Sequence, residues 1–263
     1  MLFALWGVDV SLVALSWGVL IAALFRIPLL TFGPLMLLFA MTWVYTLTTR
    51  VLRSLSGRET AYAEYYRGHA FLLLWVSFCA LLATMWLLLF CVGKFLIAFF
   101  AIPLVFALVA HMPLLKRIPF IKELLVSAAF VFACAVPAYY YGFRFSPLHM
   151  LFNKHLWCLI ALFFLFNVIR AEKTRYPHVP GGALSLGLAL VFVTSLYSIL
   201  AHDAVDYEHE FYCAVCIGCA AVHVLSVLRD KYAQPLSYIC CWPLMAAPSL
   251  LGVLMFAPDM WFN

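Results

Sequence analysis

Two polar segments interrupt an otherwise apolar chain, and their residue types are those that bind phosphate groups or metal ions. The first runs from Thr48 to Gly68 and the second from Asn167 to Gly182. Both are rich in arginine or lysine and poor in carboxylates. Arginine recognises phosphate oxygens through paired hydrogen bonds, whereas protein-bound Mg²⁺ needs carboxylate ligands. The two segments therefore favour an anionic ligand over a metal ion, and the alternative is that their cations only set the topology and touch anionic lipid.

The elements that position these segments must be membrane helices. Of the 263 residues, 67% are hydrophobic and only 10% are charged, whereas soluble domains carry about 25% charged residues. The thirteen tyrosines and eight tryptophans fit a bilayer, because both side chains favour its interface. The first apolar run lacks a basic leading region and a clear cleavage site, so it is interpreted as a retained span rather than a signal peptide.

Apolar runs long enough to cross a bilayer predict a single integral membrane domain, residues 1–263, that is all-α. Continuous rather than alternating hydrophobicity excludes a β-barrel, and helices satisfy their own backbone hydrogen bonds in lipid. The sequence predicts about nine transmembrane helices, at residues 9–25, 28–48, 69–92, 95–112, 123–142, 153–169, 183–201, 211–228 and 236–257.

The distribution of cations predicts the orientation. Only four of the sixteen lie in the loops of one side, namely Arg26, Lys94, Arg144 and Lys154. The other side holds Arg50, Arg53, Arg58, Arg67, Lys116, Arg117, Lys122, Arg170, Lys173, Arg175, Arg229 and Lys231. Cytoplasmic loops carry the excess of Lys and Arg. The N-terminus and both polar segments are therefore predicted to be cytoplasmic, in a multi-pass protein.

Other groups of potential ligands carry weaker predictions. Cys213, Cys216 and Cys219 are spaced along one predicted helix without further ligands, so they are interpreted as buried apolar residues. The segment HDAVDYEHE, residues 202–210, collects carboxylates and histidines on the opposite side, but an acidic loop there also follows from the orientation alone. His69, His111 and His178 fall on the cytoplasmic side, where they are proton carriers, ligands or ordinary interfacial residues. No nucleic-acid-binding element is present.

The arrangement resembles the UbiA superfamily of intramembrane prenyltransferases, whose two Asp-rich segments follow the second and sixth helices. The segment HMPLLKRIPFIKELLVSAAFVFACAVPAYYYG, residues 111–142, looks like the loop between the fourth and fifth helices of that family. Pro113, Lys116 and Arg117 fit its pattern. The resemblance implies a UbiA-like helical bundle and an isoprenoid or other lipid as the ligand.

Both Asp-rich motifs match the chain except at their reactive positions. In the first motif Tyr45, Arg50, Arg67 and His69 fit, while Thr49 and Arg53 replace the aspartates. In the second motif the matching residues are Phe166, Ala171, Arg175 and Gly181 or Gly182, and the residues in place of carboxylates are Asn167, Thr174, Pro177 and His178. The chain is thus predicted to be a divergent member without Mg²⁺-dependent prenyl transfer.

The resemblance and the charges together predict a site for an anionic head group. Its candidate residues are Arg50, Arg53, Arg67, Lys116, Arg117, Asn167, Arg170, Lys173 and Arg175. No metal or other cofactor is expected, and the partners would be a membrane lipid, an isoprenoid or other membrane subunits. One alternative is an active prenyltransferase that uses Mg²⁺ and a surviving acid, with Glu172 as the weak catalytic candidate. Another is an unrelated membrane subunit or a small transporter.

Overall fold

A computed structural model describes residues 6–25, 27, 32–57, 63–87, 96–112, 115, 118, 120–142, 147–170, 181–201, 208–231 and 234–261. The described residues form helices and no β-strand. The helices are α2 (Val8–Leu24), α3 (Phe32–Leu55), α4 (Ala63–Gly68), α5 (Ala70–Trp86), α6 (Leu96–Ala110), α7 (Ile121–Gly142), η3 (Pro147–Phe152), α8 (Lys154–Arg170), α9 (Gly181–Ala201), α10 (Glu208–Lys231) and α11 (Gln234–Trp261).

The all-helical class is confirmed in the described part of the chain. Each predicted apolar range overlaps one of the long helices, and the short helices α4 and η3 lie between them. Three stretches are long and apolar enough to cross a membrane, namely Gly33–Leu55, Ile121–Tyr140 and Glu208–Leu228. Shorter apolar helices occupy Val8–Leu24, Ala70–Trp86, Ala98–Ala110, Leu184–Leu200 and Cys241–Leu254. Membrane association follows, whereas nine crossings remain a prediction.

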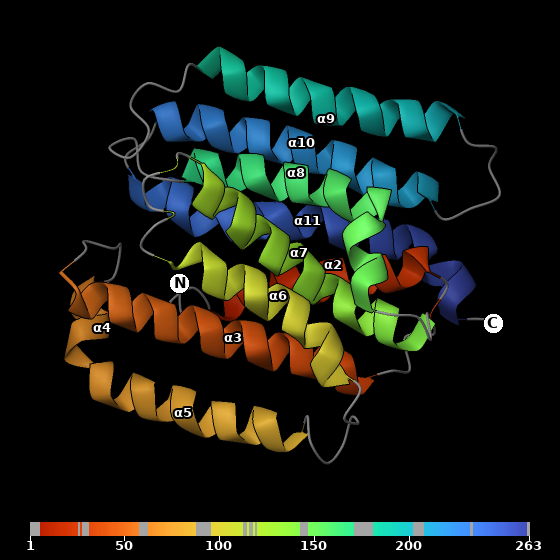
Figure 1. The fold of residues 1–263 in the computed structure, drawn as a ribbon. Helices are drawn as coiled ribbons and strands as arrows, with labels where there is room; N and C mark the ends of the chain where they lie inside the picture. Colours follow the sequence, from red (N-terminus) through yellow and green to blue (C-terminus); the bar gives the residue numbers. More distant parts are fainter. Residues whose placement is uncertain are drawn as a thin grey trace.

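The long helices lie side by side along a common direction, with α2 and α8 near the middle (Figure 1). Helix α2 packs against α3, α7, α10 and α11, and α8 packs against α7, α9 and α10. Helices α5 and α9 lie at opposite margins of the bundle in this view. Segments that are distant in the sequence therefore share the centre of the molecule.

Helix α2 is central because its surface is apolar on every side. Trp17 is fully buried, packs edge-on against Phe163 at 5.7 Å and donates a 2.9 Å hydrogen bond to the Met245 carbonyl. Gly18 leaves room for α3 and α7, since a Cβ there would lie 2.9 Å from a Leu38 methyl and 3.3 Å from the Cys134 carbonyl. These contacts connect α2, the first described helix, to α11, the last. They hold the helices together, and so the polar residues at the helix ends are held in place as well.

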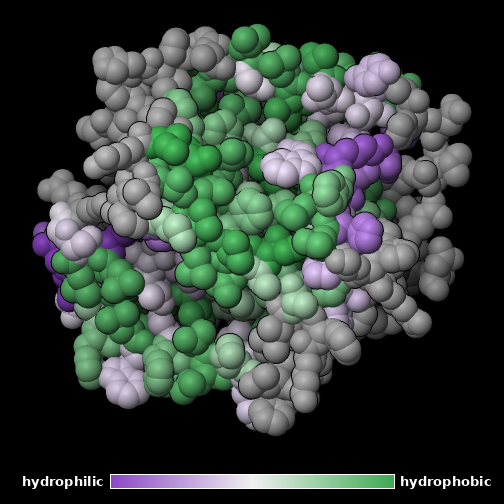
Figure 2. Space-filling model, viewed as in Figure 1, coloured by the Kyte–Doolittle hydropathy of each residue, from purple (hydrophilic) through white to green (hydrophobic). Residues whose placement is uncertain are grey.

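The exposed surface is apolar along the sides and polar at the two ends. Figure 2 shows a broad hydrophobic area between hydrophilic atoms near α4 and hydrophilic atoms near the start of α8. Large exposed side chains continue along the marginal helices and include Phe71, Trp75, Phe78, Leu82, Trp86, Leu186, Leu190, Val193, Tyr197 and Leu200. An apolar surface of this extent is typical of contact with lipid rather than with water.

Candidate functional site

The polar residues predicted to bind an anion gather at one end of the bundle, which we call the basic end. Among the described residues it comprises the ends of α3 and α8, helix α4 and the starts of α2, α7 and α11. Its candidate residues are Arg50, Arg53, Arg67, Asn167 and Arg170. The basic end lies on the left in Figure 1, because α3 ends beside α4 there.

Arg50 is bound by an acid that the sequence analysis did not consider. Its Nη2 donates to both carboxylate oxygens of Asp9 at 3.1 Å, and the two side chains are only 10% and 12% exposed. Asp9 lies in the first turn of α2, where the helix dipole favours a negative charge. Arg50 therefore meets an anion only as part of a buried, charge-compensated pair.

Asn167 and Arg170 hold the end of α8 against its neighbours. Asn167 donates from Nδ2 to the Ser127 hydroxyl at 2.8 Å, and Ser127 donates to the Glu123 carbonyl at 2.6 Å. The Arg170 guanidinium lies 4.9 Å from the ring centre of Trp242, a cation–π distance. These two described residues therefore face α7 and α11 within the bundle.

Described residues of both motifs contact helices that pack against each other. Arg50 pairs with Asp9 of α2, and the Arg170 guanidinium lies over the Trp242 ring of α11. Helix α11 packs against α2. Two cations from distant parts of the sequence are thus held by neighbouring helices.

The remaining residues of the first motif line the other side of α3. Arg53 and Thr49 both interact with the Tyr45 hydroxyl, and the His111 ring meets the Tyr45 ring edge-on at 6.2 Å. The spacing 45, 49 and 53 places these side chains on one helix face. Arg67 is exposed on α4, and His69 stacks on Tyr65 at 4.6 Å. Arg53 thus lies on the same face of α3 as Tyr45, whose ring contacts His111 just after α6.

Several predicted residues lie outside the described part of the chain. These are Lys116, Arg117, Glu172, Lys173, Thr174, Arg175, Pro177, His178, His202, Asp203 and Asp206. Within the described ranges, no three His, Cys, Asp or Glu side chains are grouped so that they could hold a metal ion. The three α10 thiols are free and belong to no such group; they are Cys213, Cys216 and Cys219.

The described acids of the basic end do not fit Mg²⁺. Both oxygens of Asp9 accept from Arg50, Glu64 is exposed on α4, and Glu123 is buried at the start of α7. A bridged diphosphate needs one or two carboxylates directed at each metal ion. Binding Mg²⁺ to Asp9 would leave the charge of Arg50 buried beside a divalent cation, which is strongly unfavourable.

The sequence analysis missed a second group of polar residues at the opposite end, formed by His155, Glu208 and Tyr212. Glu208 was noted only as part of the acidic loop, and His155 was not considered. A signal was available, because His155 opens a predicted span directly after Lys154, in a chain with few ionisable residues. Asp9 could have been found in the same way, at the first position of the predicted span 9–25.

Comparison with known proteins adds no relative to these observations. No family model, no curated protein and no solved structure matches the chain. The resemblance to the UbiA superfamily therefore depends on the motifs alone, and the functional argument depends on the geometry of the described side chains.

Proposed function

We propose that this chain is a multi-pass membrane protein on a UbiA-like scaffold that binds the anionic head group of an isoprenoid or another lipid at its basic end. It works without Mg²⁺-dependent prenyl transfer, as a pseudoenzyme that presents the lipid or joins a membrane complex. The proposal is supported most directly by Arg50, paired with Asp9 of α2, and by Arg170, which lies over Trp242 of the neighbouring helix α11.

The charges at the basic end suit a phosphate or diphosphate group. Arg170 is partly exposed, and its guanidinium lies over the Trp242 ring, which orients it. Arg50 is neutralised by Asp9, so it contributes hydrogen-bond donors more than net charge. A partly desolvated arginine forms strong, charge-assisted hydrogen bonds with phosphate oxygens. Arg170 is therefore the residue whose replacement tests head-group binding.

The apolar sides of the bundle suit the remainder of such a ligand. Exposed aromatic and aliphatic side chains continue from the basic end along the marginal helices. A lipid whose head group lies at the helix ends can keep its chain beside these surfaces, in the bilayer core. The predicted orientation, with the basic end in the cytoplasm, would place this head group in the cytoplasmic leaflet.

Binding to nanodisc-embedded protein tests the proposal. The probes are farnesyl diphosphate and phosphatidylglycerol, which separate a prenyl diphosphate from a bilayer phospholipid as the source of the phosphate. We expect Arg170→Gln to weaken binding of one probe by about tenfold, because a hydrogen bond to a charged group is lost. Lys154→Gln removes a cation from the opposite end and should have no effect. Equal binding by both variants would reject the head-group site.

A second assay separates this proposal from the active-enzyme alternative. Purified protein is incubated with a prenyl diphosphate, Mg²⁺ and aromatic acceptors, and release of diphosphate is measured. We expect no metal-dependent release. Diphosphate release that Glu172→Gln abolishes would favour an active prenyltransferase. If no variant changes either diphosphate release or lipid binding, an unrelated subunit or transporter would be favoured. Arg53→Asp combined with Asn167→Asp should improve metal binding without restoring turnover.

A further inference from the structure

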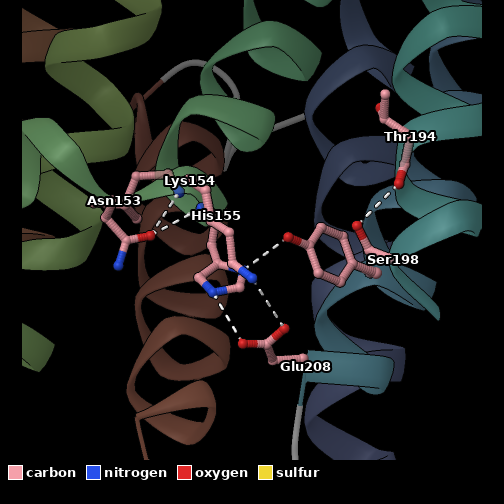
Figure 3. Close-up of polar contacts among 8 residues, drawn as sticks. Asn153, Lys154, His155, Thr194, Ser198 and Glu208 are labelled. Atoms are coloured by element: carbon pink, nitrogen blue, oxygen red, sulfur yellow. Dashed lines mark hydrogen bonds and ion pairs between the residues drawn. The ribbon is translucent and has the colours of Figure 1, made fainter. Parts of the chain in front are cut away.

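A buried histidine lies between a carboxylate and a tyrosine at the end of the bundle opposite the basic end (Figure 3). His155, in the first turn of α8, has its Nε2 3.2 Å from Glu208 Oε1 and its Nδ1 2.9 Å from the Tyr212 hydroxyl. Glu208 and Tyr212 are one turn apart on α10. Lys154 Nζ lies 3.6 Å from the other Glu208 oxygen. Four ionisable groups thus meet where α8 and α10 pack together.

Helix α9 packs beside this group, against both α8 and α10. The Ser198 hydroxyl on α9 donates to the Thr194 carbonyl of its own helix at 3.0 Å. Figure 3 shows Ser198 and Thr194 on α9, across from His155 and Glu208. The order of side-chain contacts is therefore Glu208, His155 and Tyr212.

The surroundings of the imidazole are apolar. The His155 side chain is only 9% exposed, and the Phe211 ring packs edge-on against it at 5.9 Å. Asn153 caps the start of α8 by accepting from the His155 backbone N–H at 2.9 Å, which fixes the side chain over α10. Ionisable groups in such a position are costly unless every charge and proton has a partner. The hydrogen-bond chain must therefore be satisfied in each protonation state that His155 adopts.

The neutral state has one satisfied arrangement. Nε2 must carry the proton, because a bare Nε2 would face the acceptor oxygen of Glu208. Nδ1 then accepts from the Tyr212 O–H. The opposite tautomer would leave two acceptors in contact, which costs the hydrogen bond and adds repulsion.

The protonated state is satisfied by reversing one hydroxyl. A proton added at Nδ1 makes the imidazole a donor on both sides, to Glu208 and to the Tyr212 oxygen. The Tyr212 O–H then rotates away from Nδ1, and the added positive charge lies against the Glu208 carboxylate, 3.2 Å from Nε2.

We propose that His155, Glu208 and Tyr212 form a proton-binding site at the end of the bundle opposite the basic end. The proton enters at Nδ1 of His155 and no other covalent bond changes. The described titratable groups around it are Lys154 and Cys158 on α8, Glu208 and Tyr212 on α10 and Tyr139 on α7, which interacts with Asn153. This site makes the end of the bundle responsive to pH, independently of lipid binding at the basic end.

Nitrogen NMR of the imidazoles in nanodisc-embedded protein tests the site. The chain has eight histidines, and the spectrum of His155→Gln identifies the signals of His155. We expect the Nε2–H tautomer to convert reversibly into the imidazolium form between about pH 9 and about pH 5. A neutral Nδ1–H tautomer, or no titration in this range while the protein stays folded, would overturn the proposal.

Glu208→Gln separates this role from simple packing. It removes the negative charge that lies 3.2 Å from Nε2, so the titration midpoint of His155 should fall by about one pH unit. Glu64→Gln makes the same acid-to-amide change on the exposed surface of α4 and is the control. An unchanged midpoint in Glu208→Gln, with only a change in stability, would refute the proton-binding role.

Discussion

The pairing of Asp9 with Arg50 shows how a buried charge limits what a candidate site residue can do. Arg50 has the type and position expected of an anion-binding residue, yet its Nη2 is 3.1 Å from both oxygens of a carboxylate. The partner could not be predicted from the spacing, because the two residues belong to different helices and meet only through the packing of α2 on α3. Composition predicts that charges are rare, but packing decides which ones meet.

We predict that Asp9→Asn destabilises the protein by about 3–5 kcal/mol, because it leaves the charge of Arg50 buried without its carboxylate. The measurement is reversible unfolding by denaturant in detergent micelles. Glu64→Gln makes the same acid-to-amide change on the exposed surface of α4 and should have little effect.

A double variant distinguishes the charge from the shape of this contact. Asp9→Leu combined with Arg50→Met replaces the pair by apolar side chains, and it should recover most of the lost stability. If Asp9→Asn is no less stable than Glu64→Gln, the pair does not form as described.

The helices extend further into the polar segments than the apolar runs predict. The predicted span 28–48 became α3, Phe32–Leu55, and 211–228 became α10, Glu208–Lys231. Hydrophobicity marks the part of a helix that lipid or neighbouring helices cover, whereas hydrogen bonding continues as long as the residues tolerate helical geometry. Arg50 and Arg53 are therefore on a helix and not in a loop, which fixes the faces that they present.

The close approach of α2 to its neighbours depends on a glycine. Gly18→Val should destabilise the bundle by about 1–3 kcal/mol, because the new methyl groups would meet the Leu38 side chain and the Cys134 carbonyl. Gly68→Val is the control, since nothing lies within 4 Å of a Cβ there. Thermal unfolding of the two variants in the same detergent gives the comparison, and equal midpoints would contradict the packing of α2.

Helix α9 tests whether the shorter apolar helices also cross the membrane. Its apolar stretch, Leu184–Leu200, is exposed along much of one side at the margin of the bundle. We predict that this segment inserts when it is placed in a host protein and scored by glycosylation. Leu190→Arg should raise the apparent free energy of insertion by about 2.5–3.5 kcal/mol, and Leu190→Ala by much less. Failure of the unmodified segment to insert would reduce the number of spans.

The whole molecule is apolar along its sides and polar at both ends, as the composition predicts. The helical class and the apolar ranges could be predicted because each depends on local hydrophobicity. The two polar ends differ in chemistry, one gathering arginines and the other a histidine between a glutamate and a tyrosine. That difference could not be predicted in full, because His155, Glu208 and Tyr212 come from two helices that are neighbours only in the folded bundle.

The opposite placement of the two ends leads to a prediction of topology. In a variant without its native cysteines, a cysteine introduced at Ser56 should react with a membrane-impermeant maleimide only from the cytoplasmic side. Ser56 is exposed where α3 ends, on the side to which twelve of the sixteen cations are assigned. Lys154→Cys, at the start of α8, should react only from the other side, as should Asp206→Cys, which lies outside the described residues. Leu47→Cys is fully buried and serves as the unreactive control. Reaction of Ser56→Cys and Lys154→Cys from the same side would contradict the topology, and with it the assignment of the basic end to the cytoplasmic leaflet.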